Sequence, residues 1–272
     1  KKKEKMEKYN NFKKKYGQNF LTDKNLLSAI VRDANITSDD QVLEIGAGEG
    51  ALTQALCAVA QKVVSYEIDS ELLPILGQKF KNQKNVQIVF GDALRTDICE
   101  IEKHFDKKYH LVANIPYYIT SPLIFKFLEN SNDVLDITIM IQKEVAERIC
   151  AKPNSSQYGA LSVVCQNYCD CKIMRTVSKK MFKPVPKVDS AVIFMKVKKT
   201  FDSDFSYLVK NSFAMRRKTL YNNIQNAYDI SKQQLLDAFK LSNISDNARA
   251  ENLDTQQFNA LCTCLKTFDK IK

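Results

Sequence analysis

Glu44-Ile45-Gly46-Ala47-Gly48-Glu49-Gly50 holds three of the seven glycines in this chain of 272 residues. An apolar run, 42–45, leads into it, and a helical pattern, 51–60, follows. Glycines between a strand and a helix permit a tight turn and let a ligand approach the backbone beside the helix N-terminus. The stretch therefore predicts a nucleotide-binding turn, although a strand–helix turn with no ligand requires similar glycines.

Around this turn, short β-branched runs alternate with amphipathic patterns from residue 41 to residue 141. The expected strands are 42–45, 63–66, 86–90, 110–113 and 137–141, and the expected helices are 51–60, 70–81 and 121–129. Such alternation indicates an α/β protein with a doubly wound parallel sheet.

The remainder of the chain predicts a change of architecture. Two strand-like runs, 161–174 and 188–197, have no long helix between them and are expected to form an antiparallel hairpin at the sheet edge. The β pattern stops near residue 202, and 207–215, 231–240 and 255–268 are helical in pattern. With a boundary near Thr200, we expect a basic tail (1–12), an α/β domain (13–200) and a small helical domain (201–272).

Composition excludes several classes of protein. The chain is 44% hydrophobic and 26% charged, which is typical of a globular protein. We see neither a run of about 18 apolar residues that could cross a bilayer nor a secretory signal after the lysine-rich start. Eight cysteines without a C-x-x-C pair indicate free thiols in a reducing cytoplasm. With two histidines and no clustered ligands, we expect no metal site.

The net charge of +10 is unevenly distributed. Residues 1–20 carry eight lysines and two acids, residues 21–171 carry 14 basic and 20 acidic side chains, and residues 172–218 carry 13 basic and three acidic ones. An acidic body flanked by basic segments suggests a polyanionic partner such as RNA. A solvated lysine tail explains the first segment equally well.

Two carboxylates follow the next two predicted strands. Glu67 ends the second strand, 21 residues after Gly46, and Asp92 directly follows the third. The carboxyl ends of parallel strands meet at one edge of a sheet, where an acid can accept both ribose hydroxyls of an adenosine cofactor. Because Gly46-x-Gly48-x-x-Ala51 also fits the dinucleotide pattern, these features leave NAD and S-adenosyl-L-methionine (SAM) open.

Asn114-Ile115-Pro116-Tyr117 follows the fourth strand. It resembles the Asn-x-Pro-Tyr motif of enzymes that methylate amino nitrogens, and this resemblance favours SAM. The N6 lone pair of adenine is delocalised into the ring, so the amino group is a poor nucleophile. Hydrogen bonds from N6 to the Asn114 side-chain oxygen and to a backbone carbonyl would draw the nitrogen toward sp³ geometry. Tyr117 can stack on the base, a contact worth roughly 1–3 kcal/mol. Asn and Pro after a strand also occur in ordinary turns.

With these motifs in this order, the chain resembles the KsgA/RsmA-type small-subunit (16S) ribosomal RNA adenine N6,N6-dimethyltransferases over about residues 13–255. The matching segments are 15–21, 44–50, 114–122, 142–148, 158–163, 182–190 and 216–220. The resemblance implies a class I SAM-dependent methyltransferase fold, which is a Rossmann-like doubly wound sheet. Residues 13–200 would then be the catalytic domain, and residues 201–272 a small helical, RNA-binding domain. It implies dimethylation of two adjacent adenines in the 3′-terminal hairpin loop of 16S rRNA, in the small subunit or its precursor, by a monomer.

The resemblance also assigns roles to residues. Catalytic roles fall to Asn114, Pro116, Tyr117 and Phe182, with Phe182 closing on the flipped base opposite Tyr117. The expected cofactor-binding residues are Gln18, Asn19, Leu21, Gly46, Gly48, Glu67, Ile68, Asp92, Ala93 and Asn114. The expected RNA-binding residues are Lys183, Lys187, Arg216, Arg217 and Lys218.

Three alternatives stay open. The erythromycin-resistance methylases of large-subunit rRNA share the Asn114–Tyr117 motif, an NAD-dependent oxidoreductase shares the glycine turn, and a non-catalytic assembly factor could retain the fold. Among the remaining features, Cys165, Cys169 and Cys171 have the same strand parity, and we interpret them as packing residues.

Overall fold

The computed structural model describes residues 20–21 and 23–268. The strands are β1 (Phe20–Leu21), β2 (Gln41–Ile45), β3 (Lys62–Glu67), β4 (Val86–Phe90), β5 (Tyr109–Asn114), β6 (Val134–Gln142), β7 (Cys169–Val177), β8 (Phe182–Lys183) and β9 (Ser190–Val197). The α-helices are α2 (Lys24–Asp33), α3 (Ala51–Cys57), α4 (Leu73–Lys79), α5 (Ile98–Glu102), α6 (Thr120–Asn130), α7 (Lys143–Ile149), α8 (Ala160–Tyr168), α9 (Ser203–Ser212), α10 (Leu220–Ala227), α11 (Lys232–Leu241) and α12 (Thr255–Thr267). Short 3₁₀ turns are η1 (Ser70–Leu72), η2 (Tyr117–Ile119), η3 (Lys179–Met181) and η4 (Ala250–Asn252).

The chain divides into two units. The first contains the described residues up to 146 together with 172–197, and the second contains 147–171 and 198–268. Residues 147–171 thus group with the C-terminal helices, whereas the sequence analysis includes them in the catalytic domain.

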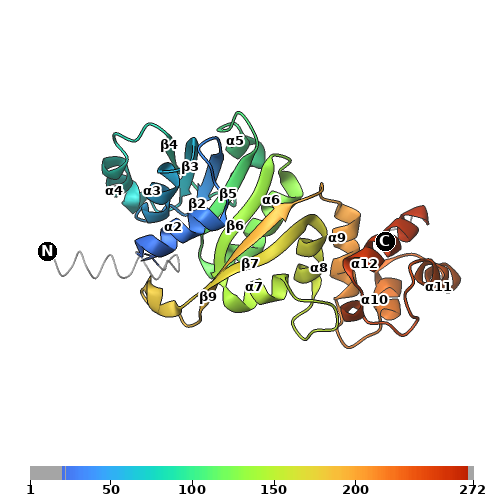
Figure 1. Ribbon diagram of the computed structural model, residues 1–272. Coiled ribbons are helices and arrows are strands. Elements are labelled where there is room, and N and C mark those ends of the chain that lie inside the picture. Colours follow the sequence, from blue (N-terminus) through green and yellow to red (C-terminus); the bar gives the residue numbers. More distant parts are fainter. Residues whose placement is uncertain (1–19, 22, 269–272) are drawn as a thin grey trace. The chain divides into compact units, whose positions relative to one another are not determined.

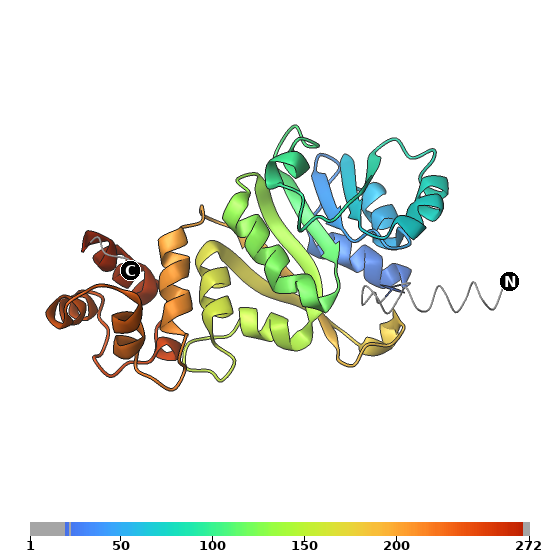
Figure 2. The ribbon, with the colours of Figure 1, turned by 180° about the vertical axis from the view of Figure 1, so that it is seen from behind.

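The first unit is built on a seven-stranded sheet of order β4-β3-β2-β5-β6-β9-β7. Strands β2 to β6 pair in parallel, which confirms the five predicted strands, and β9 runs antiparallel to β6. Helices α2 and α3 lie over one face of this sheet and α6 lies over the other (Figures 1 and 2). Six parallel strands form the usual dinucleotide fold, so the antiparallel β9 between β6 and β7 distinguishes this sheet from it.

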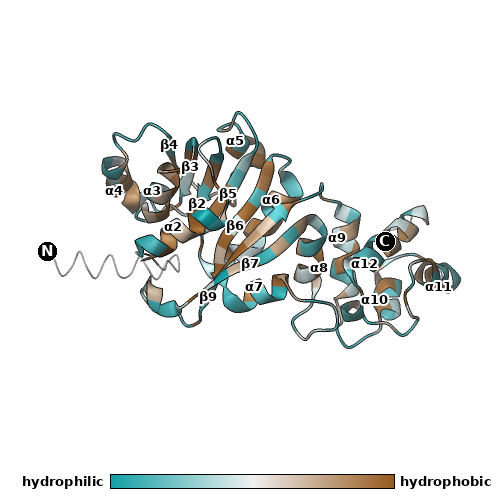
Figure 3. Ribbon diagram, in the orientation of Figure 1, coloured by the Kyte–Doolittle hydropathy of each residue, from teal (hydrophilic) through white to brown (hydrophobic). Residues whose placement is uncertain are grey.

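The central strands are apolar because both of their faces are covered. Val42, Val63, Leu111 and Val112 are fully buried, and each stabilises the fold by roughly 1.5–3 kcal/mol. Figure 3 shows apolar residues concentrated along β5 and β6. Polar chemistry is consequently confined to the strand ends.

The second unit contains the predicted helices. Helix α9 contacts α8, α10 and α12, and its Phe205 packs edge-on against Tyr168 and Phe258. These contacts confirm an α-helical C-terminal region. Within the described part of the chain, no helix has the length and apolar character needed to cross a membrane.

The structure corrects one predicted strand. The run 161–174 was expected to be extended, but residues 160–168 form α8 and the strand begins only at Cys169. A continuous apolar run is compatible with both a buried strand and a buried helix. Ser162 favours the helix, because its hydroxyl accepts a hydrogen bond from the Gly159 N–H at 3.1 Å. Cys165 therefore lies on a helix, not on the strand of Cys169 and Cys171.

Two of these cysteines are nevertheless packing residues. Cys165 and Cys169 are buried, and burial raises the pKa of the Cys169 thiol to about 12. A thiol that stays protonated at neutral pH is a weak nucleophile. The structure therefore agrees with the packing interpretation for Cys165 and Cys169, while Cys171 is only partly buried.

Candidate functional site

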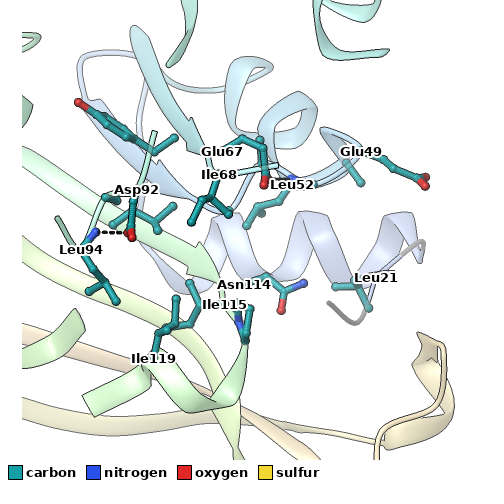
Figure 4. A pocket seen from close by; sticks show the side chains of 18 of the residues that line it. Leu21, Glu49, Leu52, Glu67, Ile68, Asp92, Leu94, Asn114, Ile115 and Ile119 are labelled. Atoms are coloured by element: carbon teal, nitrogen blue, oxygen red, sulfur yellow. Dashed lines mark hydrogen bonds between the residues drawn. The ribbon is translucent and has the colours of Figure 1, made fainter. Parts of the chain in front are cut away.

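A pocket lies where β2, β3, β4 and β5 end, and we call it the strand-end pocket (Figure 4). Figure 4 shows Glu67, Asp92 and Asn114 at the ends of their strands around it. Its lining includes Leu21, Gly46, Gly48, Glu49, Tyr66, Glu67, Ile68, Asp92, Ala93, Asn114, Pro116, Tyr117, Tyr118 and Phe182. The structure thus brings together every predicted catalytic and cofactor-binding residue except Gln18 and Asn19, which lie outside the described residues.

The glycine turn has the conformation that its sequence predicts. Gly46, Gly48 and Gly50 have φ of +84°, +56° and +73°, a region that L side chains adopt only with strain. The Gly46 N–H donates to the Tyr66 carbonyl at 2.8 Å, and a Cβ at position 46 would lie 3.5 Å from the Asn114 backbone oxygen. The turn therefore lies beside the Asn114 motif, with little more than the space of a Cβ between them.

Lys79, which the sequence did not indicate as a site residue, stabilises the same turn through hydrogen bonds. Its Nζ donates to the carbonyl oxygens of Glu49 and Gly50 at 3.0 and 2.9 Å. Lys79 belongs to α4, about 30 positions further along the chain. No local sequence pattern predicts a hydrogen bond between residues so far apart. Burial lowers the pKa of this lysine.

Beneath the turn, Glu44 is fully buried. Its Oε2 accepts from the hydroxyls of Thr53 and Ser65, both at 2.6 Å, so the carboxyl group links β2 to α3 and β3. Burial raises its pKa to about 7, although both hydroxyl bonds act in the opposite direction. Glu44 is a structural support for the turn, and it does not line the pocket.

Glu67 presents an oriented carboxylate to the pocket. Its Oε2 accepts the Gly48 N–H at 2.7 Å and its Oε1 accepts the Asp69 N–H at 2.9 Å. Burial raises its pKa, and hydrogen bonds from the backbone of Asp69, Gly48 and Ile68 counteract that effect. A carboxylate has about four acceptor positions, so each oxygen keeps one for a ligand. Two neighbouring acceptors match the two hydroxyls of a ribose.

Asp92 lies at the adjacent strand end and is partly exposed. Its Oδ1 accepts the Leu94 N–H at 2.9 Å (dashed in Figure 4), and Oδ2 is 3.4 Å from Nε of Arg95. Ile68 is 46% exposed and Ala93 is buried, so apolar surface lies next to both carboxylates. Apolar walls with a few convergent polar groups are typical of ligand pockets, and here they suit an adenosine moiety.

The Asn114 motif forms the next wall. Asn114 is the last residue of β5, and Tyr117 begins the 3₁₀ turn η2. The Tyr117 hydroxyl is 2.8 Å from Oγ of Ser190, a buried residue at the start of β9. This bond spans 73 positions and holds the ring of Tyr117. Ser190 supports the site through Tyr117, a role that its place in the sequence does not reveal.

Phe182 and Leu21 meet across a short antiparallel pair. Strand β1 pairs with β8 in the register Leu21 to Phe182, and both residues line the pocket. Phe182 is only 2% exposed and packs in the main hydrophobic cluster. Phe182 is thus a nearly enclosed side chain that still borders the pocket.

The five predicted RNA-binding residues are all exposed. Lys183 and Lys187 belong to the first unit, on the segment that carries Phe182, and Arg216, Arg217 and Lys218 belong to the second unit. Arg216 also donates to the Ser156 carbonyl at 3.5 Å. In residues 20–21 and 23–268, no three His, Cys, Asp or Glu side chains form a group suited to a metal ion.

Known proteins similar to this chain share both its length and its fold. A family model described as ribosomal RNA adenine dimethylase matches residues 9–267. Curated relatives named ribosomal RNA small subunit methyltransferase A, from Clostridium botulinum (strain ATCC 19397 / Type A) and Clostridioides difficile (strain 630), are each 42% identical. The alignments cover 93% and 97% of this chain and 94% and 95% of the relatives.

Solved structures extend the similarity to the fold. A dimethyladenosine transferase from Plasmodium falciparum has a TM-score of 0.81 at 29% identity, covering 93% of this chain and 100% of the other. The 23S rRNA methyltransferase ErmE has a TM-score of 0.70 at 26% identity, covering 91% and 100%.

Proposed function

The chain belongs to the ribosomal RNA adenine dimethylase family, and we propose that it dimethylates N6 of two adjacent adenines in the 3′-terminal hairpin loop of small-subunit (16S) rRNA. It is a SAM-dependent rRNA adenine dimethyltransferase. The observation that carries this function is the close approach of the Gly46 turn to Asn114, beside Glu67 and Asp92 in one pocket. A cofactor held by the acids is thereby next to a motif that can accept hydrogen bonds from an amino group.

The strand-end pocket fits SAM. Glu67 would bind the ribose hydroxyls through its two remaining acceptor positions, and Asp92 would accept the adenine amino group. Gly46 and Gly48 leave room beside the backbone, while Leu21, Ile68 and Ala93 supply apolar contact. Gln18 and Asn19 are proposed to complete the site. Bound SAM supplies an activated methyl group, so the protein has to provide position and desolvation more than acid–base chemistry.

The target amino group is held by the Asn114 motif. The side-chain oxygen of Asn114 and a nearby backbone carbonyl would accept the two N6 hydrogens, which directs the nitrogen lone pair toward the cofactor. The Tyr117 ring, fixed through Ser190, would stack on one face of the base. Pro116 shapes this turn, and Phe182 would cover the other face.

The small subunit is favoured over the large one. The relatives named for the small subunit are 42% identical, against 26% for the 23S enzyme. Lys183, Lys187 and the run 216–218 are proposed to bind rRNA phosphates, with the C-terminal helices as an RNA-binding unit. We further propose a cytoplasmic enzyme that acts as a monomer on the small subunit or its precursor.

Radiolabelled methyl transfer to unmethylated small subunits, followed by mapping of the modified bases, tests the proposal. The Asn114→Ala variant should lose transfer while its RNA binding stays close to wild type, and Asn130→Ala, at an exposed position on α6, should transfer normally. Label confined to large-subunit rRNA, or normal transfer by Asn114→Ala, would overturn the assignment. Calorimetric titration with SAM and with NAD tests the cofactor independently.

A further inference from the structure

Tyr118 differs from the other aromatic residues of the strand-end pocket. Of the four aromatic residues that the structure places in its lining, Tyr66 and Phe182 are buried and Tyr117 is half-buried with its hydroxyl bound to Ser190. Tyr118 is 67% exposed. Its ring therefore faces solvent at a pocket that takes a nucleobase.

The backbone separates Tyr118 from Tyr117. Both belong to η2, and a 3₁₀ helix has three residues per turn, so successive side chains diverge by about 120°. Two rings diverging at that angle from neighbouring Cα atoms cannot lie parallel to the same face of one base. If Tyr117 stacks on the target adenine, Tyr118 is presented to a different nucleotide.

We propose that Tyr118 is the stacking platform for the adenine adjacent to the one being methylated. This inference rests on the proposed function, in which two adenines are neighbours in a hairpin loop. Loop bases that leave their stack regain favourable contact on aromatic side chains. Tyr118 is thus a specificity residue for the adenine pair, since a purine offers a larger ring surface than a pyrimidine.

Methylation of an adenine does not prevent it from stacking on Tyr118. Stacking uses the face of a base and not its hydrogen-bonding edge, so an adenine that already carries two N6 methyl groups can still stack on Tyr118. Because RNA runs in one direction, a platform fixed beside Tyr117 lies on the same side of each target. The partner adenine therefore stacks on Tyr118 in one of the two rounds, and the nucleotide flanking the pair does so in the other.

The test is a double-mutant cycle between protein and RNA. Small-subunit particles are reconstituted with 16S rRNA in which one of the two adenines is intact or abasic, and transfer to the other adenine is measured. For wild type, loss of the neighbouring base should raise KM about 5- to 150-fold for one of the two target adenines, the one whose partner lies on the side of Tyr118. For Tyr118→Ala, KM should be high on both particles, with less than about a 2-fold difference between them.

Two further variants separate stacking from other roles. Tyr118→Phe keeps the ring and should behave as wild type, and Leu73→Ala, which removes a 51%-exposed side chain of α4 outside the pocket lining, should also do so. The SAM dissociation constant of Tyr118→Ala, measured without RNA, should be unchanged. An equal abasic penalty in wild type and Tyr118→Ala would overturn the inference, as would weakened SAM binding.

The intact particle separates this inference from the proposed function. Failure of wild-type protein to methylate intact particles would overturn the proposed function itself. Normal methylation of intact particles together with an unchanged abasic penalty in Tyr118→Ala would overturn only the role of Tyr118.

Discussion

Gly50→Ala should destabilise the first unit. Gly50 is the N-cap of α3 with φ of +73°, and a Cβ there would lie 2.6 and 2.9 Å from ring atoms of Phe80 and 3.0 Å from Leu76. The left-handed backbone costs about 1–2 kcal/mol for a non-glycine residue, and overpacking adds about 1–3 kcal/mol. Together they predict a loss of roughly 2–5 kcal/mol in the free energy of unfolding.

Gly77→Ala is the matched control. Gly77 lies within α4, is exposed, and a Cβ there would meet nothing within 4 Å. Alanine should stabilise this helix by up to about 1 kcal/mol. Because both variants lower the entropy of the unfolded chain equally, the difference between them reports the native-state strain at Gly50.

Urea unfolding followed by circular dichroism gives both free energies, and calorimetry gives the SAM affinity. We expect opposite signs for the two variants and weaker SAM binding only for Gly50→Ala, since displacement of Gly50 also moves the Gly48 N–H that orients Glu67. If Gly50→Ala were as stable as Gly77→Ala, the geometry derived for the turn would be refuted.

Three other perturbations follow from the hydrogen bonds described above. Glu67→Gln leaves one of two backbone N–H groups without an acceptor, so the free energy of unfolding should fall by about 1–3 kcal/mol. The SAM dissociation constant should rise about 10-fold or more. Burial alone lowers the pKa of His110, but Asp136, 2.9 Å from its Nδ1, helps to raise the pKa above 6.5. The stabilisation from charged His110 is therefore complete below about pH 6.5 and lost as pH rises through the raised pKa, so Asp136→Asn should destabilise the protein more at pH 6 than at pH 9 in urea titrations. Tyr117→Phe, which loses the bond to Ser190, should lower kcat with an unchanged SAM dissociation constant, measured by single-turnover transfer and calorimetry.

Each of these has an outcome that would count against it. Glu71→Gln, at an exposed acid of η1, should leave SAM binding unchanged, and an equal loss in both glutamine variants would remove the special role of Glu67. A pH-independent effect of Asp136→Asn would contradict the His110 ion pair. A raised SAM dissociation constant in Tyr117→Phe would mean that the hydroxyl supports the cofactor and not the target base.

The features predicted correctly are those that depend on neighbouring residues. Strands β2 to β6 follow from runs of β-branched residues, and the glycine turn follows from three closely spaced glycines that all adopt positive φ. Register in a parallel sheet brings strand ends together, so the order of Gly46, Glu67, Asp92 and Asn114 along the chain was sufficient to predict one pocket.

Features that depend on distant contacts were not predictable. The run 161–174 was misassigned because periodicity cannot separate a buried helix from a buried strand. The bonds from Lys79 to the glycine turn and from Ser190 to Tyr117 join residues about 30 and 73 positions apart, and no local pattern marks either pair.

The difference between the two kinds of feature is clearest in the aromatic residues. The sequence predicts Tyr117 at a base-binding motif, the family resemblance adds Phe182, and neither singles out Tyr118. Whether a ring is buried, anchored or open to solvent depends on what other segments pack against it, and the tertiary structure alone shows Phe182 enclosed in the core and Tyr118 exposed. Local chemistry is encoded by adjacent residues, whereas exposure is a property of the packed chain.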